Sequence, residues 1–76
     1  MISFELKKPV GSLPDELEIY VDKEGVTSLI AQLELLCSNK TDHVHLMNES
    51  WGGSHLSPGV HNSENSEINH VKVVLI

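Results

Sequence analysis

The feature that most constrains this chain is one segment with the spacing of an amphipathic helix. Six apolar residues follow the helical repeat there, namely Val26, Leu29, Ile30, Leu33, Leu36 and Cys37. Such spacing places them along one face of a helix. Asp22 is a suitable N-cap before the segment, and the residues at 38–40 suit a helix terminus. Gly25 in the first turn costs about 1 kcal/mol relative to alanine, so the pattern predicts a helix with one buried face and an irregular start.

Alternating apolar and polar residues predict strands on both sides of this helix. The predicted strands are residues 3–7, 17–21, 43–47 and 68–76. Pro9, Gly11 and Pro14 mark a loop that joins the first two strands as a hairpin. The last two strands are separated by the long loop 48–67, whose length of about 20 residues calls for a functional or disordered explanation.

The order strand–strand–helix–strand–strand predicts an α+β fold. A single helix covers only one face of a sheet, so we expect one two-layer domain over residues 1–76, with the helix packed on a mostly antiparallel four-stranded sheet. Leu17, Ile19 and Val21 are expected on one face of the second strand, and Val44 and Leu46 point inward from the third. The uncovered face is predicted to carry Ser3, Glu5, Lys7, Glu18, Tyr20, His43, His45, Lys72, Val74 and Ile76.

Composition limits the classes of function. A chain of 76 residues buries only about 60% of the surface of its unfolded form, which disfavours an elaborate enclosed active site. Eleven acidic residues oppose five basic ones, all lysine, and the net charge of −6 disfavours nucleic-acid binding and suits a basic partner. Cys37 is the only cysteine, which excludes an internal disulfide. No secretory signal or membrane-spanning segment is evident, so we expect a soluble cytoplasmic protein with no membrane association.

Histidine is the residue type here that most suggests chemistry. His43 and His45 share one face of a predicted strand, a spacing that occurs in zinc and copper sites. Further candidate ligands are His55, His61, His70, Glu49, Glu64 and Glu67. The solvent face of a strand also takes histidine without a metal, and no closed ligand set or complete nucleophile–base pair is evident. We therefore expect no catalysis, no cofactor and no required metal, with a small His-rich metal-binding or regulatory domain as the first alternative.

Trp51, the only tryptophan, precedes Gly52 and Gly53 in a predicted turn. Its indole could close the end of a small core, which has only Phe4 and Tyr20 as other aromatic residues. It could also be a direct anchor for a partner. The first interpretation is favoured, because small domains need large apolar residues to complete their cores.

The run from His43 to Met47, followed by Ser50-Trp51-Gly52-Gly53 and Leu56, resembles family 32 of the bacterial immunity proteins. These belong to polymorphic toxin and contact-dependent growth inhibition systems. The resemblance is close over these residues, agrees loosely with the strand–helix order before them, and does not extend into residues 57–67. It implies a non-enzymatic inhibitor that protects the producing cell from a toxin. The acidic, arginine-free composition would complement a basic nuclease or RNase.

We therefore expect an immunity protein that binds and neutralises a cognate toxin in the cytoplasm. The contacts are expected in the long loop and its adjoining strand face, at Glu49, Ser50, Trp51, His55, Glu64, Glu67, His43 and His45. The second alternative is a homodimeric structural module that uses Val74, Ile76 and the uncovered sheet face as its interface.

Overall fold

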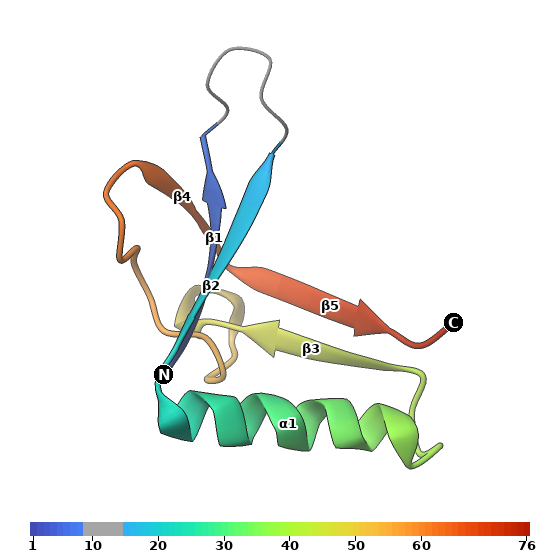
Figure 1. Cartoon of the computed structure of the whole chain (residues 1–76). Coiled ribbons are helices and arrows are strands. Elements are labelled where there is room, and N and C mark those ends of the chain that lie inside the picture. Colours follow the sequence, from blue (N-terminus) through green and yellow to red (C-terminus); the bar gives the residue numbers. More distant parts are fainter. Residues whose placement is uncertain (9–14) are drawn as a thin grey trace.

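A computed structural model describes residues 1–8 and 15–76 and contains one α-helix, one 3₁₀ turn and five strands (Figure 1). Their bounds are β1 Ile2–Lys7, β2 Glu16–Val21, α1 Lys23–Cys37, β3 His43–Met47, η1 Glu49–Trp51, β4 Asn65–Ile68 and β5 His70–Val74. The predicted hairpin loop with Pro9, Gly11 and Pro14 lies outside the described residues. The predicted α+β class, with one helix and antiparallel strands, is confirmed.

The helix lies where its apolar spacing predicts it. The Asp22 carboxylate accepts a hydrogen bond from the backbone N–H of Gly25 at 2.7 Å, which caps the first turn. At the other end, the backbone N–H of Ser38 donates to the Glu34 carbonyl at 3.0 Å. Both ends therefore have partners for some of the backbone groups that a helix cannot satisfy internally.

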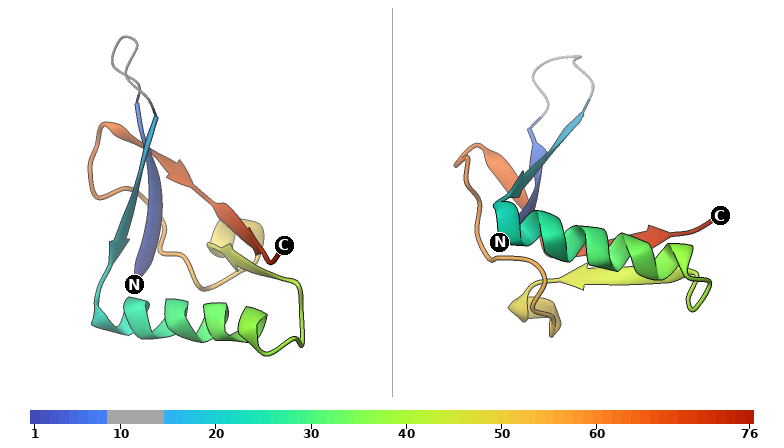
Figure 2. Two further views of the ribbon diagram at one scale, coloured as in Figure 1. Left: turned by 45° about the vertical axis from the view of Figure 1, so that its right-hand side comes forward. Right: turned by 60° about the horizontal axis from the view of Figure 1, so that its bottom comes forward.

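The strands are divided between two sheets. One has the order β2-β1-β4 and the other pairs β3 with β5, and both are antiparallel. The strand predicted at 68–76 in fact begins at Asn65 and is interrupted at Asn69. Its first part pairs with β1 and its second part with β3, so the chain passes from one sheet to the other at this residue (Figures 1 and 2). The expected single sheet of four strands is thus split by this interruption, and the predicted loop 48–67 also contains η1 and the start of β4.

The core lies where the two sheets and the helix meet. Its buried cluster consists of Ile2, Phe4, Leu46 and Leu56, with Leu29, Ile68 and Val71 packed against it. Leu56 comes from the chain between η1 and β4, which therefore contributes to the core. Leu17, Ile19 and Val21 share one face of β2 as expected, but the core does not cover this face there, since Leu17 is 51% and Ile19 48% exposed.

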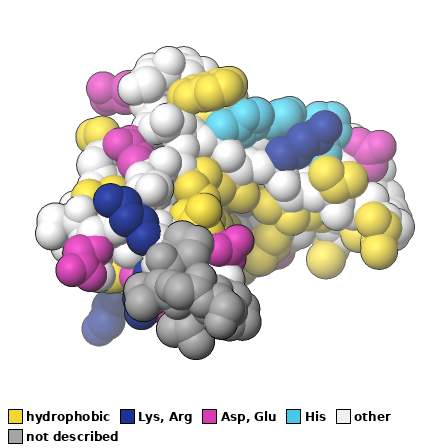
Figure 3. All heavy atoms as spheres, turned by 90° about the horizontal axis from the view of Figure 1, so that it is seen from above, with side chains coloured by type: hydrophobic (Ala, Val, Ile, Leu, Met, Phe, Trp, Pro, Cys, Tyr) yellow, Lys and Arg dark blue, Asp and Glu magenta, His cyan; other side chains and the backbone are white. Residues whose placement is uncertain are grey.

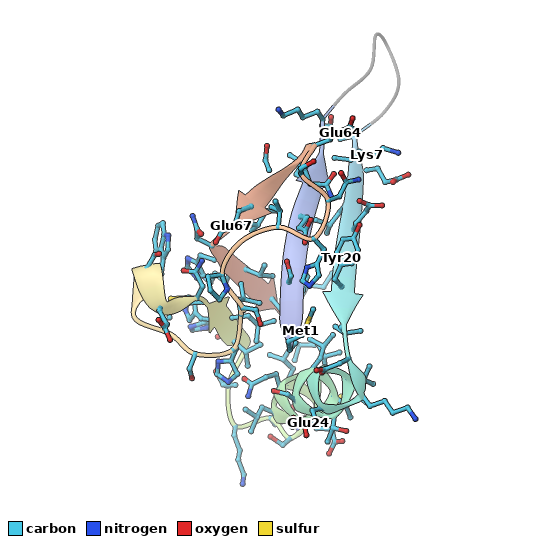
Figure 4. All side chains as sticks on the ribbon, turned by 90° about the vertical axis from the view of Figure 1, so that its left-hand side faces the viewer. Met1, Lys7, Tyr20, Glu24, Glu64 and Glu67 are labelled. Atoms are coloured by element: carbon cyan, nitrogen blue, oxygen red, sulfur yellow. The ribbon has the colours of Figure 1, made fainter. Side chains whose placement is uncertain are left out.

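The other face of the β2-β1-β4 sheet is partly covered by the chain that leads into β4. Figure 4 shows this segment crossing in front of β1. Ser3 and Glu5 are buried beneath it, whereas the sequence pattern placed both on an uncovered face. The correction has a physical cause, since hydrogen bonds from the crossing segment satisfy the carboxylate of Glu5.

Gly25 is required by a close approach between the start of α1 and the start of β1. A Cβ atom at this position would lie 2.0 Å from the carbonyl oxygen of Met1 and 3.1 Å from the side chain of Ile2. That carbonyl also accepts a hydrogen bond from the backbone N–H of Asp22. The unfavourable helix propensity of glycine is therefore offset by packing that only glycine permits.

This contact reverses the usual effect of a Gly→Ala substitution inside a helix. We expect Gly25→Ala to destabilise the fold by about 1–3 kcal/mol, because the new methyl group displaces the backbone of Met1. Urea unfolding followed by circular dichroism measures the change. Ala31→Gly at an exposed helix position is the matched control and should cost about 1 kcal/mol from propensity alone. Stabilisation by Gly25→Ala would contradict the close approach.

Candidate partner-binding site

Four aromatic rings form a row along the outer face of the β3–β5 sheet. The ring centroids of Trp51 and His70 are 5.3 Å apart, those of His70 and His45 are 4.9 Å apart, and those of His45 and His43 are 5.0 Å apart. We call Trp51, His70, His45 and His43 the Trp–His row. Histidine side chains lie side by side on one face of the molecule, next to a basic side chain (Figure 3).

Strand register explains how the histidines come together. In the β3–β5 ladder, Met47 is opposite His70 and His45 is opposite Lys72. Alternate residues of a strand share a face, so His43, His45 and His70 project from the same side of the sheet. The residues between them on β3, Val44 and Leu46, are buried on the other side.

Trp51 is held in place by a tight turn. The carbonyl oxygen of Asn48 accepts hydrogen bonds from the backbone N–H groups of Trp51 and Gly53, both at 3.0 Å. Gly52 ends the 3₁₀ turn with a φ of 82°, in the left-handed region that favours glycine. A Cβ atom on Gly53 would lie 2.6 Å from the Met47 carbonyl oxygen. The two glycines that follow Trp51 are therefore geometric requirements of this turn.

The indole of Trp51 does not close the core. Its side chain is 57% exposed and its ring lies against His70, while Leu56 fills the core at 3% exposure. The favoured interpretation of Trp51 as a core residue is therefore wrong. The turn ties the backbone of this segment to β3 by main-chain hydrogen bonds, so the indole is free to face outward.

Asn48 connects the turn to the junction between β4 and β5. Its side chain is 1% exposed, and its amide nitrogen donates to a Glu67 carboxylate oxygen at 2.8 Å and to the Asn69 side-chain oxygen at 2.6 Å. Its backbone N–H donates to the Asn69 carbonyl at 3.1 Å. Glu67 is thereby fixed beside the turn.

Protonation limits the charge of the row. Burial is the main cause that lowers the pKa of His45, with smaller contributions from the charges of His43, His70 and Lys72. The Nδ1 atom of His45 and the Nε2 atom of His70 are 2.7 Å apart, so one ring donates a proton and the other accepts it. At neutral pH the pair therefore presents at least one neutral ring. A hydrogen bond from His43 lowers the pKa of Asp42 at the end of the row.

A second constellation, which the sequence pattern did not reveal, surrounds Glu5 on the central strand. Glu5 has no exposed surface, and its carboxylate accepts five hydrogen bonds from four residues. The donors are the Ser3 hydroxyl, the backbone N–H and ring Nδ1 of His61, the backbone N–H of Asn62 and the side-chain amide of Asn65. The available signal was the run of Asn, Ser and His between residues 57 and 67, which supplies carboxylate donors without a lysine or arginine.

Burial by itself would raise the pKa of Glu5. The hydrogen bonds outweigh this effect and lower the pKa from 4.5 to about 2. Next to this carboxylate, the rings of Tyr20 and His61 stack with centroids 5.0 Å apart. Burial also raises the pKa of Tyr20, and its hydroxyl donates to Glu18.

The structure brings together only some of the predicted contact residues. Glu49, Ser50, Trp51, His43 and His45 lie in or beside the Trp–His row, and Glu67 is joined to it through Asn48. His55 instead lines a hollow beside the start of α1, and Glu64 lies near Lys7 at the far end of the sheet (Figure 4). His70 is a member of the row that the predicted set omitted.

Two further findings concern metal binding and membranes. Within residues 1–8 and 15–76, no three side chains of His, Cys, Asp or Glu converge to hold a metal ion. The helix in the described part of the chain is too short and too polar to cross a membrane.

Comparison with known proteins identifies the family. The family model described as Immunity protein 32 matches residues 16–71, which contain the turn, the Trp–His row and most of the described elements. The chain belongs to the Immunity protein 32 family. No curated protein and no solved structure matches it.

The lowered pKa of Glu5 predicts how the fold responds to acid. A carboxylate whose folded-state pKa is depressed contributes stability above its unfolded pKa and loses that contribution as the pH falls toward the folded value. The contribution of Glu5 is therefore complete above pH 4.5 and declines toward pH 2. We expect urea unfolding of the wild type to show falling stability across this window.

Glu5→Gln should unfold at lower urea concentration than the wild type at pH 7, and the difference should shrink as the pH falls from 4.5 toward 2. Glu34→Gln, on the exposed helix surface, is the matched control and should retain the acid profile of the wild type. A Glu5→Gln profile that runs parallel to the wild type between these pH values would contradict the assignment.

Proposed function

We propose that this protein binds a cognate toxin domain through the Trp–His row and neutralises it by protein–protein contact. Membership of the Immunity protein 32 family supports a toxin partner. The observation that carries the location of the contact is the half-exposed indole of Trp51, held on a rigid turn at one end of a row of rings.

The geometry of the row suits a protein partner. Tryptophan is enriched among residues that dominate binding energy, because a large rigid ring buries much surface at little cost in side-chain entropy. The turn restrains Trp51 before binding, since the Asn48 carbonyl fixes its backbone. Glu49 and Ser50 belong to the same turn and would contact the partner together with the indole. His55 and Glu64 lie apart from the row and are not part of the proposed contact.

Charge supports a basic toxin. Asp42 lies at one end of the row, Glu49 is in the turn, and Glu67 is held beside it by Asn48. With a net charge of −6 and no arginine, the chain would attract a basic partner at long range. Basic nucleases and RNases fit this requirement, and we propose the cytoplasm of the producing cell as the compartment where they would be neutralised.

A contact role for Trp51 predicts that removal of its side chain weakens toxin binding and leaves the stability of the fold nearly unchanged. We expect Trp51→Ala to weaken binding to the product of the adjacent toxin gene by at least about 30-fold, which corresponds to about 2 kcal/mol for a binding hot spot. The free energy of unfolding should change by no more than about 1 kcal/mol, because the indole is exposed and contacts mainly His70. Isothermal titration calorimetry and urea unfolding measure the two effects.

Leu35→Ala is the matched control, since Leu35 is also a large exposed apolar residue but lies on α1. It should leave toxin affinity unchanged. If Trp51→Ala binds the toxin with unchanged affinity, the Trp–His row is not the contact surface. If Trp51→Ala loses much of its stability, the indole stabilises the fold.

Electrostatic capture predicts a salt-dependent association rate. We expect the rate of toxin binding to fall as ionic strength rises, because the Debye length shrinks to about 8 Å at physiological salt. Glu49→Gln should lower the rate and flatten its salt dependence, whereas Glu24→Gln on α1 should do less. Stopped-flow kinetics over a salt series checks this, and salt-independent association would rule out steering by the acidic residues.

A further inference from the structure

A second surface consists of aliphatic side chains that the fold leaves uncovered. Seven residues with exposures of 37–51% form it: Leu6, Leu17, Ile19, Val21, Val26, Ile30 and Leu33. We call this surface the open apolar face.

The strand part of this face follows from the register of the sheet. Leu6 is opposite Leu17, Phe4 is opposite Ile19 and Ile2 is opposite Val21. Directly opposed residues share a face of the sheet, so the exposed side chains of β2 continue the surface on which Phe4 and Ile2 are buried. The face is therefore an extension of the core that the rest of the chain does not cover.

The helix part follows from the width of the apolar stripe. Leu29 and Leu36 lie on one flank of the stripe, where Leu36 is buried and Leu29 packs against the core. Val26, Ile30 and Leu33 lie on the other flank and stay exposed. Only Asp22 separates β2 from α1, and the helix contacts both β1 and β2. The two parts therefore meet where the end of β2 leads into the start of α1, as the ribbons of Figure 2 show.

The molecule as a whole exposes more surface than a folded monomer of its mass usually does. The chain exposes 5368 Å², whereas a folded monomer of 8.4 kDa exposes about 4,600 Å². The excess, roughly 700–800 Å² over the molecule as a whole, is close to the area of about 800 Å² that each partner buries in a stable complex. A face of this kind on an uncomplexed protein promotes aggregation.

We propose that a second copy of this chain covers the open apolar face and forms a symmetric dimer. None of the seven residues is charged, so two acidic copies can meet here without placing carboxylates of this face against each other. A basic toxin would find no acidic partner within this face, while acids flank the Trp–His row. A second copy is also present whenever the protein is made, so the face is covered before a toxin arrives.

The sheet topology agrees with this arrangement. In the sheet of the described residues, β2 is an outer strand, and its free edge lies beside the face. A two-fold axis through the face brings the same aliphatic residues of both copies together. The Trp–His row projects from the face of the β3–β5 sheet opposite to Val44 and Leu46, so it stays accessible in the dimer. This interface differs from the one suggested by Val74, which lies on the histidine side of that sheet.

Sedimentation equilibrium of the full chain over a concentration series tests the proposal. The expected mass is about twice 8.4 kDa at micromolar concentration. Ile30→Glu should raise the dimer dissociation constant by more than about 100-fold, because it buries two uncompensated charges per dimer. The substituted side chain is half-exposed in one chain, so the monomer should fold, as circular dichroism would show.

Leu35→Glu, on the opposite side of α1, is the matched control and should remain dimeric. If Ile30→Glu does not fold, Ile19→Thr provides the same test with a residue suited to a strand. A wild type that is monomeric at all concentrations would overturn the proposal, as would a dimer that neither variant weakens. A monomeric wild type whose toxin binding is lost on Ile30→Glu would assign the face to the toxin instead. A dimer that binds no toxin would leave this inference standing and remove the proposed function.

Discussion

The buried carboxylate of Glu5 is the interaction on which much of the arrangement depends. Glu5 lies on β1, the central strand of the three-stranded sheet, and accepts backbone hydrogen bonds from His61 and Asn62. These bonds hold the segment before β4 across the polar face of the sheet, and the amide of Asn65 extends them into β4 itself. Because an ionised group loses hydration on burial, it must find several donors in the fold. The position of β4 against β1 is therefore coupled to one charged side chain.

Asn48 fixes the other end of the segment between β3 and β4 by hydrogen bonds. Its main chain fixes the turn of Trp51, and its side chain joins Glu67 and Asn69 where β4 passes into β5. Buried, hydrogen-bonded polar groups specify geometry more sharply than apolar contacts do, because alternatives leave them unsatisfied. Between Asn48 and the residues that bond to Glu5, the chain delivers Leu56 to the core and leaves the indole of Trp51 outside. The shape of the proposed binding site thus derives from polar contacts.

The sequence was sufficient for features that depend on local periodicity and insufficient for those that depend on tertiary contacts. The helix and the histidines of β3 followed from spacing, since a repeat of 3.6 or 2 residues determines which side chains share a face. The interruption at Asn69 could not be predicted, because it depends on which neighbour each half of the strand pairs with. The alternation that correctly made Glu5 a strand residue also placed it in solvent, since no local pattern shows that a distant segment covers it. Trp51 was misjudged for a related reason: Leu56, five residues later, fills the core position.

The two surfaces of the molecule have opposite physical character, and this separation bears on how an immunity protein can work. The Trp–His row combines aromatic rings with nearby carboxylates. This composition suits selective and reversible binding of a protein partner. The open apolar face has no charge to select a partner, and its burial is favourable for any aliphatic surface of matching shape. An exposed aliphatic face of that kind is a site of aggregation unless a partner covers it. A permanent second copy on the apolar face would leave the row as the surface that discriminates between toxins, and two rows per dimer would allow two toxin molecules to be held at once.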